Sequence, residues 1–166
     1  MNTKVRNGLL IVSGIAVAGA TVGIIVKKSN DKQLITKIHS ILDNNQGTGT
    51  LKDYVDVFSG NTFLDKVKGQ IGSGQDFIKL RDEYITQYRK AIYDAGQGRA
   101  GTDEEAIKNV FKSLNDKVAI AQVAQSYLTN YKTDLLSALY DEMDEKSSDI
   151  ADIFNIIQNK PNYRLV

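Results

Sequence analysis

The sequence predicts an all-α protein in which an N-terminal single transmembrane helix precedes a small helical domain. Three observations lead to this fold class: an uncharged apolar run near the N-terminus, apolar residues at helical spacing along most of the remaining chain, and no sustained two-residue alternation of strand-forming residues. With 166 residues, 42% hydrophobic and 25% charged, the chain is long enough for one domain with its own core.

The first element is an apolar run from Gly8 to Val26 that carries no charge. As a helix rising about 1.5 Å per residue, this run is long enough to span the hydrocarbon core of a bilayer. Residues 1–28 are therefore predicted to form a single-pass membrane anchor. A cleaved secretory signal is the alternative, because Lys4 and Arg6 form a basic start. The run continues through Val26 and is closed by two lysines, which favours retention.

Two glycines in this anchor have the spacing of a helix-packing motif. Gly19 and Gly23 form a Gly-x-x-x-Gly step, which would let another helix approach closely and would permit self-association. A plain lipid-facing anchor is the simpler interpretation, since such steps are common in small apolar helices. Basic residues flank both ends of the run, so the charge pattern leans only slightly toward a cytoplasmic C-terminal domain.

Residues 29–74 are predicted to hold an amphipathic stalk helix and a degenerate first repeat unit. From Asp31 to Asn44, apolar residues fall on one helical face. His39 lies beside this stripe and is expected to be a surface or packing residue. The glycine-rich stretch 69–74 superficially resembles a phosphate loop, but no Gly-Lys-Ser/Thr follows it, so a flexible linker is expected.

Residues 75–166 are predicted to form the main helical domain. Apolar and aromatic residues from Phe77 to Ile92 keep a three-to-four residue spacing, which predicts one long helix ending near Gly96. The tyrosines of this helix are expected to pack in the core and at its rim. Further helices are predicted from Gly101 to Phe111, over 116–131, from Thr133 onward, and over 147–159 before Pro161.

A glycine loop occurs twice in the chain. The stretches ILDNNQGTGT (41–50) and IYDAGQGRAGT (92–102) share an Asp, a Gln-Gly pair and a closing Gly-Thr. A threonine with an acidic residue three positions later follows in both copies, and this pattern predicts that Thr102 caps the next helix together with Glu105. The glycines would end one helix and permit a tight entry into the next.

The order of these segments resembles an annexin repeat. The matching stretches are GTDEEAI (101–107), KTDLLSAL (132–139) and DIADIFNII (149–157), with Tyr127 near the end of one helix and an acidic pair at Asp141 and Glu142. The resemblance covers about 75 residues, from 85 to 159, which is one repeat. It implies a helical domain built as a single annexin-type repeat.

The resemblance also implies a calcium site. In annexins, carbonyls of the glycine loop bind calcium, an acidic side chain later in the repeat caps the ion, and membrane phosphate completes the shell; calcium accepts such oxygen ligands. The residues that would form this site are Gly98, Arg99, Gly101, Thr102 and Glu142. Asp141 is an alternative cap. The other interpretation of the loop is a purely structural turn, without any metal cofactor.

Composition excludes several classes of function. A formal net charge of +1 gives no general attraction for nucleic acid, and no nucleic-acid partner is expected. The chain has no cysteine and one histidine, which disfavours thiolate chemistry, cysteine metal sites and histidine-based triads. No pair of carboxylates has the apolar setting that separates pKa values for acid–base catalysis, so no catalytic residue is predicted.

The sequence thus predicts a non-enzymatic, membrane-anchored structural or interaction protein that links a bilayer to a protein assembly. The expected partners are the bilayer itself and other proteins of an envelope complex or of a membrane-containing virion. A calcium-dependent lipid- or ligand-binding annexin-like module is the alternative. A third hypothesis is a hydrolase of envelope polymers that uses Glu142 or Glu105 as its acid.

Overall fold

The computed structural model describes residues 56–97, 101–143 and 149–166, and regular structure in these ranges is helical. The predicted all-α class is confirmed for this part of the chain. The predicted anchor with Gly19 and Gly23, the stalk helix, His39 and the first glycine loop lie outside the described residues. Within the described ranges, no helix has both the length and the apolar character needed to cross a membrane.

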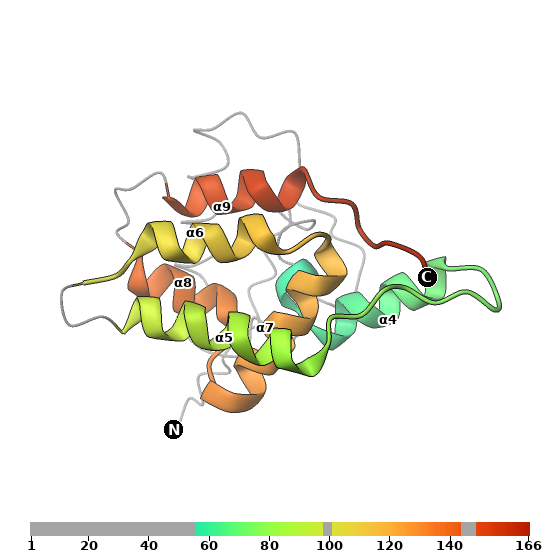
Figure 1. The fold of residues 1–166 in the computed structure, drawn as a ribbon, viewed down its shortest axis with the longest axis horizontal. Coiled ribbons are helices and arrows are strands. Elements are labelled where there is room, and N and C mark those ends of the chain that lie inside the picture. Colours follow the sequence, from blue (N-terminus) through green and yellow to red (C-terminus); the bar gives the residue numbers. More distant parts are fainter. Residues whose placement is uncertain (1–55, 98–100, 144–148) are drawn as a thin grey trace, which may run out of the picture.

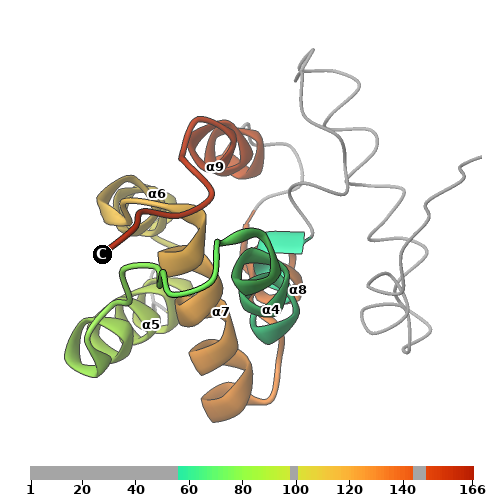
Figure 2. The same cartoon turned by 90° about the vertical axis from the view of Figure 1, so that its right-hand side faces the viewer.

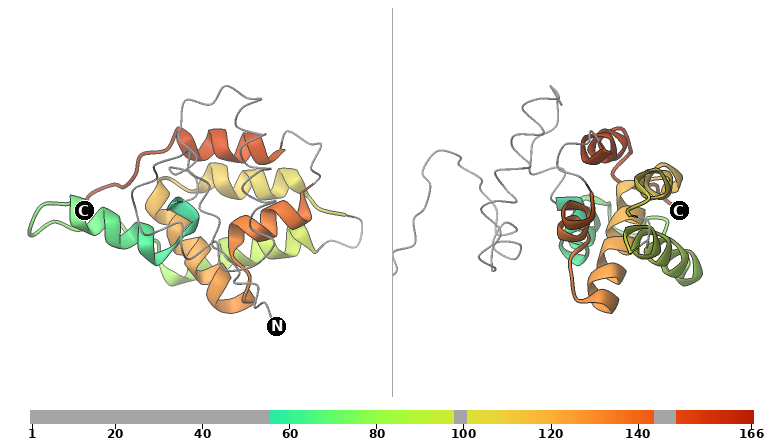
Figure 3. Two further views of the ribbon diagram at one scale, coloured as in Figure 1. Left: turned by 180° about the vertical axis from the view of Figure 1, so that it is seen from behind. Right: turned by 90° about the vertical axis from the view of Figure 1, so that its left-hand side faces the viewer.

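Within the described ranges, six helices follow a helical turn at residues 56–58. They are α4 (Asn61–Gln70), α5 (Asp82–Gly96), α6 (Glu104–Ser113), α7 (Lys117–Tyr131), α8 (Leu135–Glu142) and α9 (Asp149–Gln158). Helix α7 runs between α5 and α6 on one side and α4 and α8 on the other, as Figures 1 and 2 show. Helix α9 lies along α6, and the view from behind places α4 and α8 in front of α7 (Figure 3).

The central position of α7 explains its composition. This helix is apolar on nearly every face, which is typical of a helix that is enclosed by its neighbours. Its buried residues are Val118, Ala119, Ile120, Ala121, Val123, Ala124 and Tyr127. The three alanines have short side chains, so neighbouring helices can approach the α7 backbone closely. Helices α6, α8 and α9 each contribute side chains to the core that are nearly inaccessible to solvent, among them Phe111, Leu136 and Ile153.

Aspartates set the beginnings of two predicted helices. The Oδ1 atom of Asp116 accepts a hydrogen bond of 2.7 Å from the amide of Ala119, and Oδ1 of Asp134 accepts one of 2.8 Å from the amide of Ser137. Both are N-cap bonds, which satisfy amides that have no partner inside the helix. The predicted helices over 116–131 and from Thr133 onward are confirmed.

The long helix predicted from Phe77 is wrong at its N-terminal end. Helix α5 begins at Asp82, and Phe77 instead forms an isolated antiparallel bridge with Leu165. The amide of Ile78 donates to the carbonyl of Arg164 at 2.7 Å. Phe77 is buried in the paired segment. Helical spacing alone had predicted that it lies on the apolar face of the long helix. The C-terminal segment that makes the pairing runs back from α9 toward the turn after α4 (Figure 1).

The glycine-rich stretch 69–74 is split between a helix and a turn. Gly69 lies inside α4, and Gly74 has a positive φ of 87° in the turn that follows. Helix α4 contributes Phe63 and Val67 to the same hydrophobic core as α7. The segment before the turn is therefore packed into the helical domain.

Candidate functional site

The second glycine loop joins α5 to α6, and the predicted calcium residues lie at its two sides. Gly98 and Arg99 lie outside the described residues. Gly101 is exposed and has a φ of 111°, a left-handed conformation that favours glycine. Thr102 and Glu142, the other two candidates, are both described and half-buried.

The structure brings Thr102 and Glu142 together although they are 40 positions apart. The hydroxyl of Thr102 donates a hydrogen bond of 2.6 Å to the backbone carbonyl of Glu142. Next to this bond, Nε2 of Gln97 donates to Oε1 of the Glu142 carboxylate at 2.8 Å. Glu142 therefore contacts both ends of the glycine loop, with its backbone carbonyl bound to Thr102 and its carboxylate bound to the side-chain amide of Gln97.

Gly96 explains how the Glu142 side chain reaches this place. A β-carbon at position 96 would lie 3.2 Å from Cγ of Glu142, closer than most real contacts of a β-carbon, and 3.5 Å from Cδ, which is an ordinary contact. Glycine at the end of α5 therefore leaves room for the side chain that comes from α8. A cavity of about 10 Å³ beneath this contact is lined by Gly96, Tyr127 and Glu142 among others.

The predicted capping role of Thr102 is wrong. The N-cap of α6 is Asp103, whose Oδ1 accepts from the amide of Ala106 at 2.9 Å. Glu105 does not reach back to the cap, because it binds Lys112 at 3.0 Å and Lys108 at 3.1 Å. The Thr102 hydroxyl is instead used in the contact with α8, which fixes the loop to the rest of the domain.

The described residues offer few side chains that could bind a metal ion at this site. No group of three or more acidic or histidine side chains that could hold a metal ion occurs there. Asp141, the alternative cap, is exposed. Of the residues predicted to bind calcium, Glu142 is a described acidic residue that contacts the loop, and any carbonyl ligands from residues 98–100 lie outside the described part.

Glu105, one of the two proposed acids of the hydrolase hypothesis, lies in an ionic network between α6 and α9. Hydrogen bonds from Lys112 and Lys108 hold the pKa of the Glu105 carboxyl below its usual range. Lys108 also binds Asp149 at 2.8 Å, and this bond, followed by that to Glu105, raises the pKa of the Lys108 ammonium. A general acid needs a raised pKa, so this setting is the opposite of what the hydrolase hypothesis requires.

Sequence reasoning missed a cluster of three tyrosines. The rings of Tyr93 and Tyr131 are stacked with centroids 4.0 Å apart, and Tyr127 meets Tyr131 edge-on at 4.8 Å. Burial and then the charge of Glu142 raise the pKa of Tyr127 to about 12. The spacing of Tyr127 and Tyr131, one helical turn apart, is the signal that was available in the sequence.

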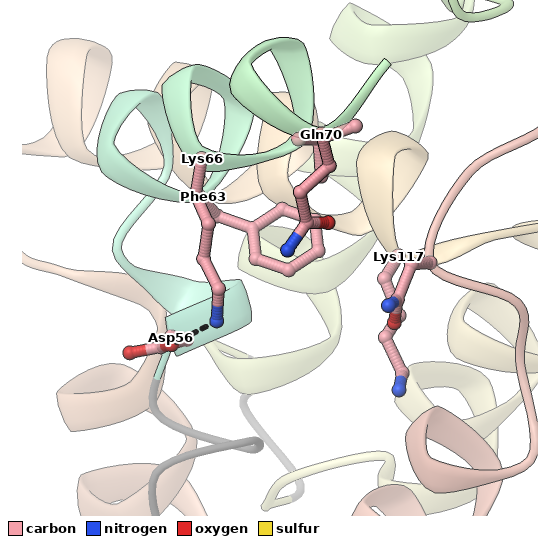
Figure 4. Close-up of a pocket in the computed structure, with 7 residues that line it drawn as sticks. Asp56, Phe63, Lys66, Gln70 and Lys117 are labelled. Atoms are coloured by element: carbon pink, nitrogen blue, oxygen red, sulfur yellow. Dashed lines mark hydrogen bonds and ion pairs between the residues drawn. The ribbon is translucent and has the colours of Figure 1, made fainter. Parts of the chain in front are cut away.

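A second cavity, of about 70 Å³, lies between α4, the start of α7 and the C-terminal segment (Figure 4). Its lining residues are Asp56, Phe63, Lys66, Val67, Gln70, Lys117 and Asn162. Asp56 is buried, and its Oδ2 accepts a hydrogen bond of 2.8 Å from Nζ of Lys66. Because three segments far apart in the chain form this cavity, no local pattern could predict it.

Comparison of the chain with known protein families, with curated proteins and with solved structures found no match.

Proposed function

We propose that this protein is a non-enzymatic, single-pass membrane protein whose helical domain links a bilayer to a protein assembly, in an envelope complex or in the internal membrane of a virion. The observation that carries the proposal is the uncharged run from Gly8 to Val26, followed by a domain with its own core. Such a run satisfies the length and polarity requirements of a membrane-spanning helix.

The packing of the domain supports a structural or interaction role. The two cavities described above are about 70 and 10 Å³, whereas sites for small-molecule substrates typically enclose roughly 300–1,000 Å³. Neither cavity could enclose a substrate of that size. We therefore favour partner recognition through the surface of the helical domain.

Membrane extraction tests the anchor. The full chain is expected to stay in the membrane fraction through alkaline carbonate washing, and Val17→Arg is expected to release a large share of it, since arginine at a helix centre costs about 2.5–3.5 kcal/mol of insertion free energy. Val166→Arg is the matched control, because Val166 is 95% exposed. Equal extraction of Val17→Arg, Val166→Arg and the unmodified chain would contradict the proposed membrane anchor.

Cross-linking in mild detergent tests the assembly. Oligomers or complexes are expected for the full chain, and Gly19→Leu with Gly23→Leu should reduce them if the anchors pack through this face. Gly14→Leu, in the same apolar run but off this step, is the control. A lone monomer in mild detergent would count heavily against a linking role.

A calcium-dependent annexin-like module is the second candidate. The contact between Thr102 and Glu142 favours it, because an acidic residue would have to lie against the glycine loop in such a site. Helices α5 to α9 also occur in the same order as the sequence segments on which the annexin resemblance rests. The geometry of Glu142 is equally suited to a structural bond, since Gln97 occupies one of its carboxylate oxygens.

Calcium titration calorimetry separates these two roles of the loop. If the loop binds calcium, the full chain gives saturable heat that Glu142→Ala removes. Asp141→Ala tests the alternative cap, and Glu83→Ala, at the exposed start of α5, controls for the loss of one acidic side chain. Absence of binding heat in all four proteins would indicate that the loop is a purely structural turn.

A further inference from the structure

We propose that the cavity between α4 and the start of α7 binds a phosphate-class oxyanion, as free phosphate or as the phosphate of a lipid headgroup. Its volume of about 70 Å³ is several times the roughly 10–15 Å³ that one ordered water needs. It is also far below the roughly 300 Å³ at which pockets for larger organic ligands begin. A single small ion is the ligand class that matches this size.

The lining of the cavity has an excess of positive charge. The lining includes two lysines, Lys66 and Lys117, and one carboxylate, Asp56, which leaves one net positive charge among the lining residues. The hydrogen bond from Lys66 to Asp56 uses one of the three N–H groups of that ammonium. The remaining groups of Lys66 and the whole ammonium of Lys117 can serve an anion, and the charge balance disfavours a cation.

Further donors come from two amides. Gln70 on α4 and Asn162 in the C-terminal segment line the cavity, and among the described residues their side-chain amides form no hydrogen bond. In Figure 4 the side chains of Lys66 and Gln70 hang from the same side of α4. An oxyanion accepts hydrogen bonds from such amides and charge-assisted bonds from the lysines, which are the stronger of the two.

The cavity has an apolar wall. Phe63 is 5% exposed and Val67 is 1% exposed, so α4 keeps water away from one side of the space. Electrostatic attraction is stronger where apolar groups replace water, because the local dielectric constant is lower. The wall therefore increases the effect of the two lysines on an ion held beside it.

The C-terminal segment holds one side of the cavity in position. The amides of Lys117 and Val118 donate to the carbonyls of Pro161 and Asn162 at 2.9 and 3.1 Å. The first amides of α7 are thus occupied by the chain itself, and side chains supply the donors of the site. The bond from Arg164 to Asp116 fixes the same segment two residues later, so the backbone at Asn162 needs little ordering when an ion binds.

The test is a titration of the full chain in detergent with inorganic phosphate, at constant ionic strength maintained with chloride. Saturable binding is expected, with NMR shifts of the backbone amides concentrated at Gln70, Lys117 and Asn162. Lys117→Gln is expected to weaken phosphate binding at least about tenfold, as the loss of a charge-assisted hydrogen bond implies. It should leave the fold intact, since a lysine at a helix N-terminus opposes the helix dipole.

Lys68→Gln is the matched control. Lys68 is exposed on the same helix and does not line the cavity, so this variant removes the same charge elsewhere. Phosphate affinity within twofold of the unmodified chain is expected for it. Asn162→Ala removes only the amide, because the backbone carbonyl that binds Val118 stays in place, and a loss of a few-fold is expected.

Three outcomes would overturn the proposal: equal weakening by Lys117→Gln and Lys68→Gln, no effect of Lys117→Gln and Asn162→Ala, or an identical response to chloride alone. Glycerol 3-phosphate, which is the simplest phospholipid without its two acyl chains, distinguishes the two sources of the anion. Tighter binding than inorganic phosphate assigns the site to lipid, and weaker binding assigns it to the free ion. These titrations use no membrane, so the result is independent of the proposed anchor.

Discussion

Arg164 binds Asp116 across 48 positions of the chain, with its Nε atom 2.8 Å from the Oδ2 atom of the carboxylate. Asp116 is fully buried, and its other oxygen caps α7 through the amide of Ala119. One carboxylate therefore begins the central helix and also holds the C-terminal segment against it. Removal of Arg164 leaves the buried Asp116 carboxylate without its charged partner.

We expect Arg164→Ala to lower the free energy of unfolding by about 1–3 kcal/mol, because the buried Asp116 carboxylate loses its charged partner. Urea unfolding of the full chain in detergent measures this change. Arg81→Ala is the control, since Arg81 and its partner Glu83 are both more than 60% exposed, and a change of less than about 0.5 kcal/mol is expected. Equal effects of the two variants on the free energy of unfolding would contradict a stabilising role of the Arg164–Asp116 bond.

Gly60, directly before α4, and Gly69, inside it, should respond in opposite directions to substitution by alanine. Gly60 precedes the helix with a φ of 58°, and a β-carbon there would lie 2.5 Å from Oε1 and 3.0 Å from Cβ of Gln125. Gly60→Ala is expected to cost about 1–3 kcal/mol of stability through strain and crowding. Gly69 lies in the same helix with open space around it, so Gly69→Ala should stabilise by up to about 1 kcal/mol. Thermal unfolding with the same sign for both would reject the described α4–α7 contact.

The cap of α6 is tested by a pair of aspartates. Asp103→Ala should destabilise the protein by about 1 kcal/mol, since the Ala106 amide loses its acceptor. Asp94→Ala is the control, because Asp94 is exposed near the C-terminal end of α5, where a negative charge opposes the helix dipole. This variant is expected to be neutral or slightly stabilising. Chemical unfolding of both decides whether Asp103 is the cap.

Stability at alkaline pH should depend on Tyr127. Its folded-state pKa of about 12 is above the ordinary value of 10.0, so its contribution is fully present below pH 10. Between pH 10 and 12 the unfolded chain loses this proton first, and that contribution is lost as pH rises. Tyr127→Phe should therefore make the decline of unfolding free energy over this range shallower. Tyr84→Phe, at an exposed position, controls for the loss of a hydroxyl, and identical slopes in both variants would refute the assignment.

Local sequence patterns predicted the later helices well. Helices α7 and α8 begin at aspartates followed by apolar residues at helical spacing, and both signals lie within a few residues of the boundary that they set. The start of α5 could not be predicted in this way. The spacing from Phe77 is helical, yet the backbone of Ile78 pairs with Arg164 from the other end of the domain.

At the end of the glycine loop, Thr102 and Asp103 give a second case in which local sequence leaves a choice that a distant contact decides. Thr102 and Asp103 are both good capping residues, so the local sequence permits either of them to begin α6. The Thr102 hydroxyl is taken by the Glu142 carbonyl, and Asp103 is left to accept from Ala106. A bond to a residue 40 positions away decided between two locally equivalent caps.

The sequence by itself determined the helical class of the described domain, because apolar spacing and capping residues act within one or two turns of chain. Only the tertiary structure decided which distant groups meet: Thr102 with Glu142, Asp116 with Arg164, and the segments around the cavity beside α4. The physical reason is that each of these groups has many acceptable partners in sequence. The packing of α4, α5 and the C-terminal segment around α7 brings these particular groups within bonding distance of one another.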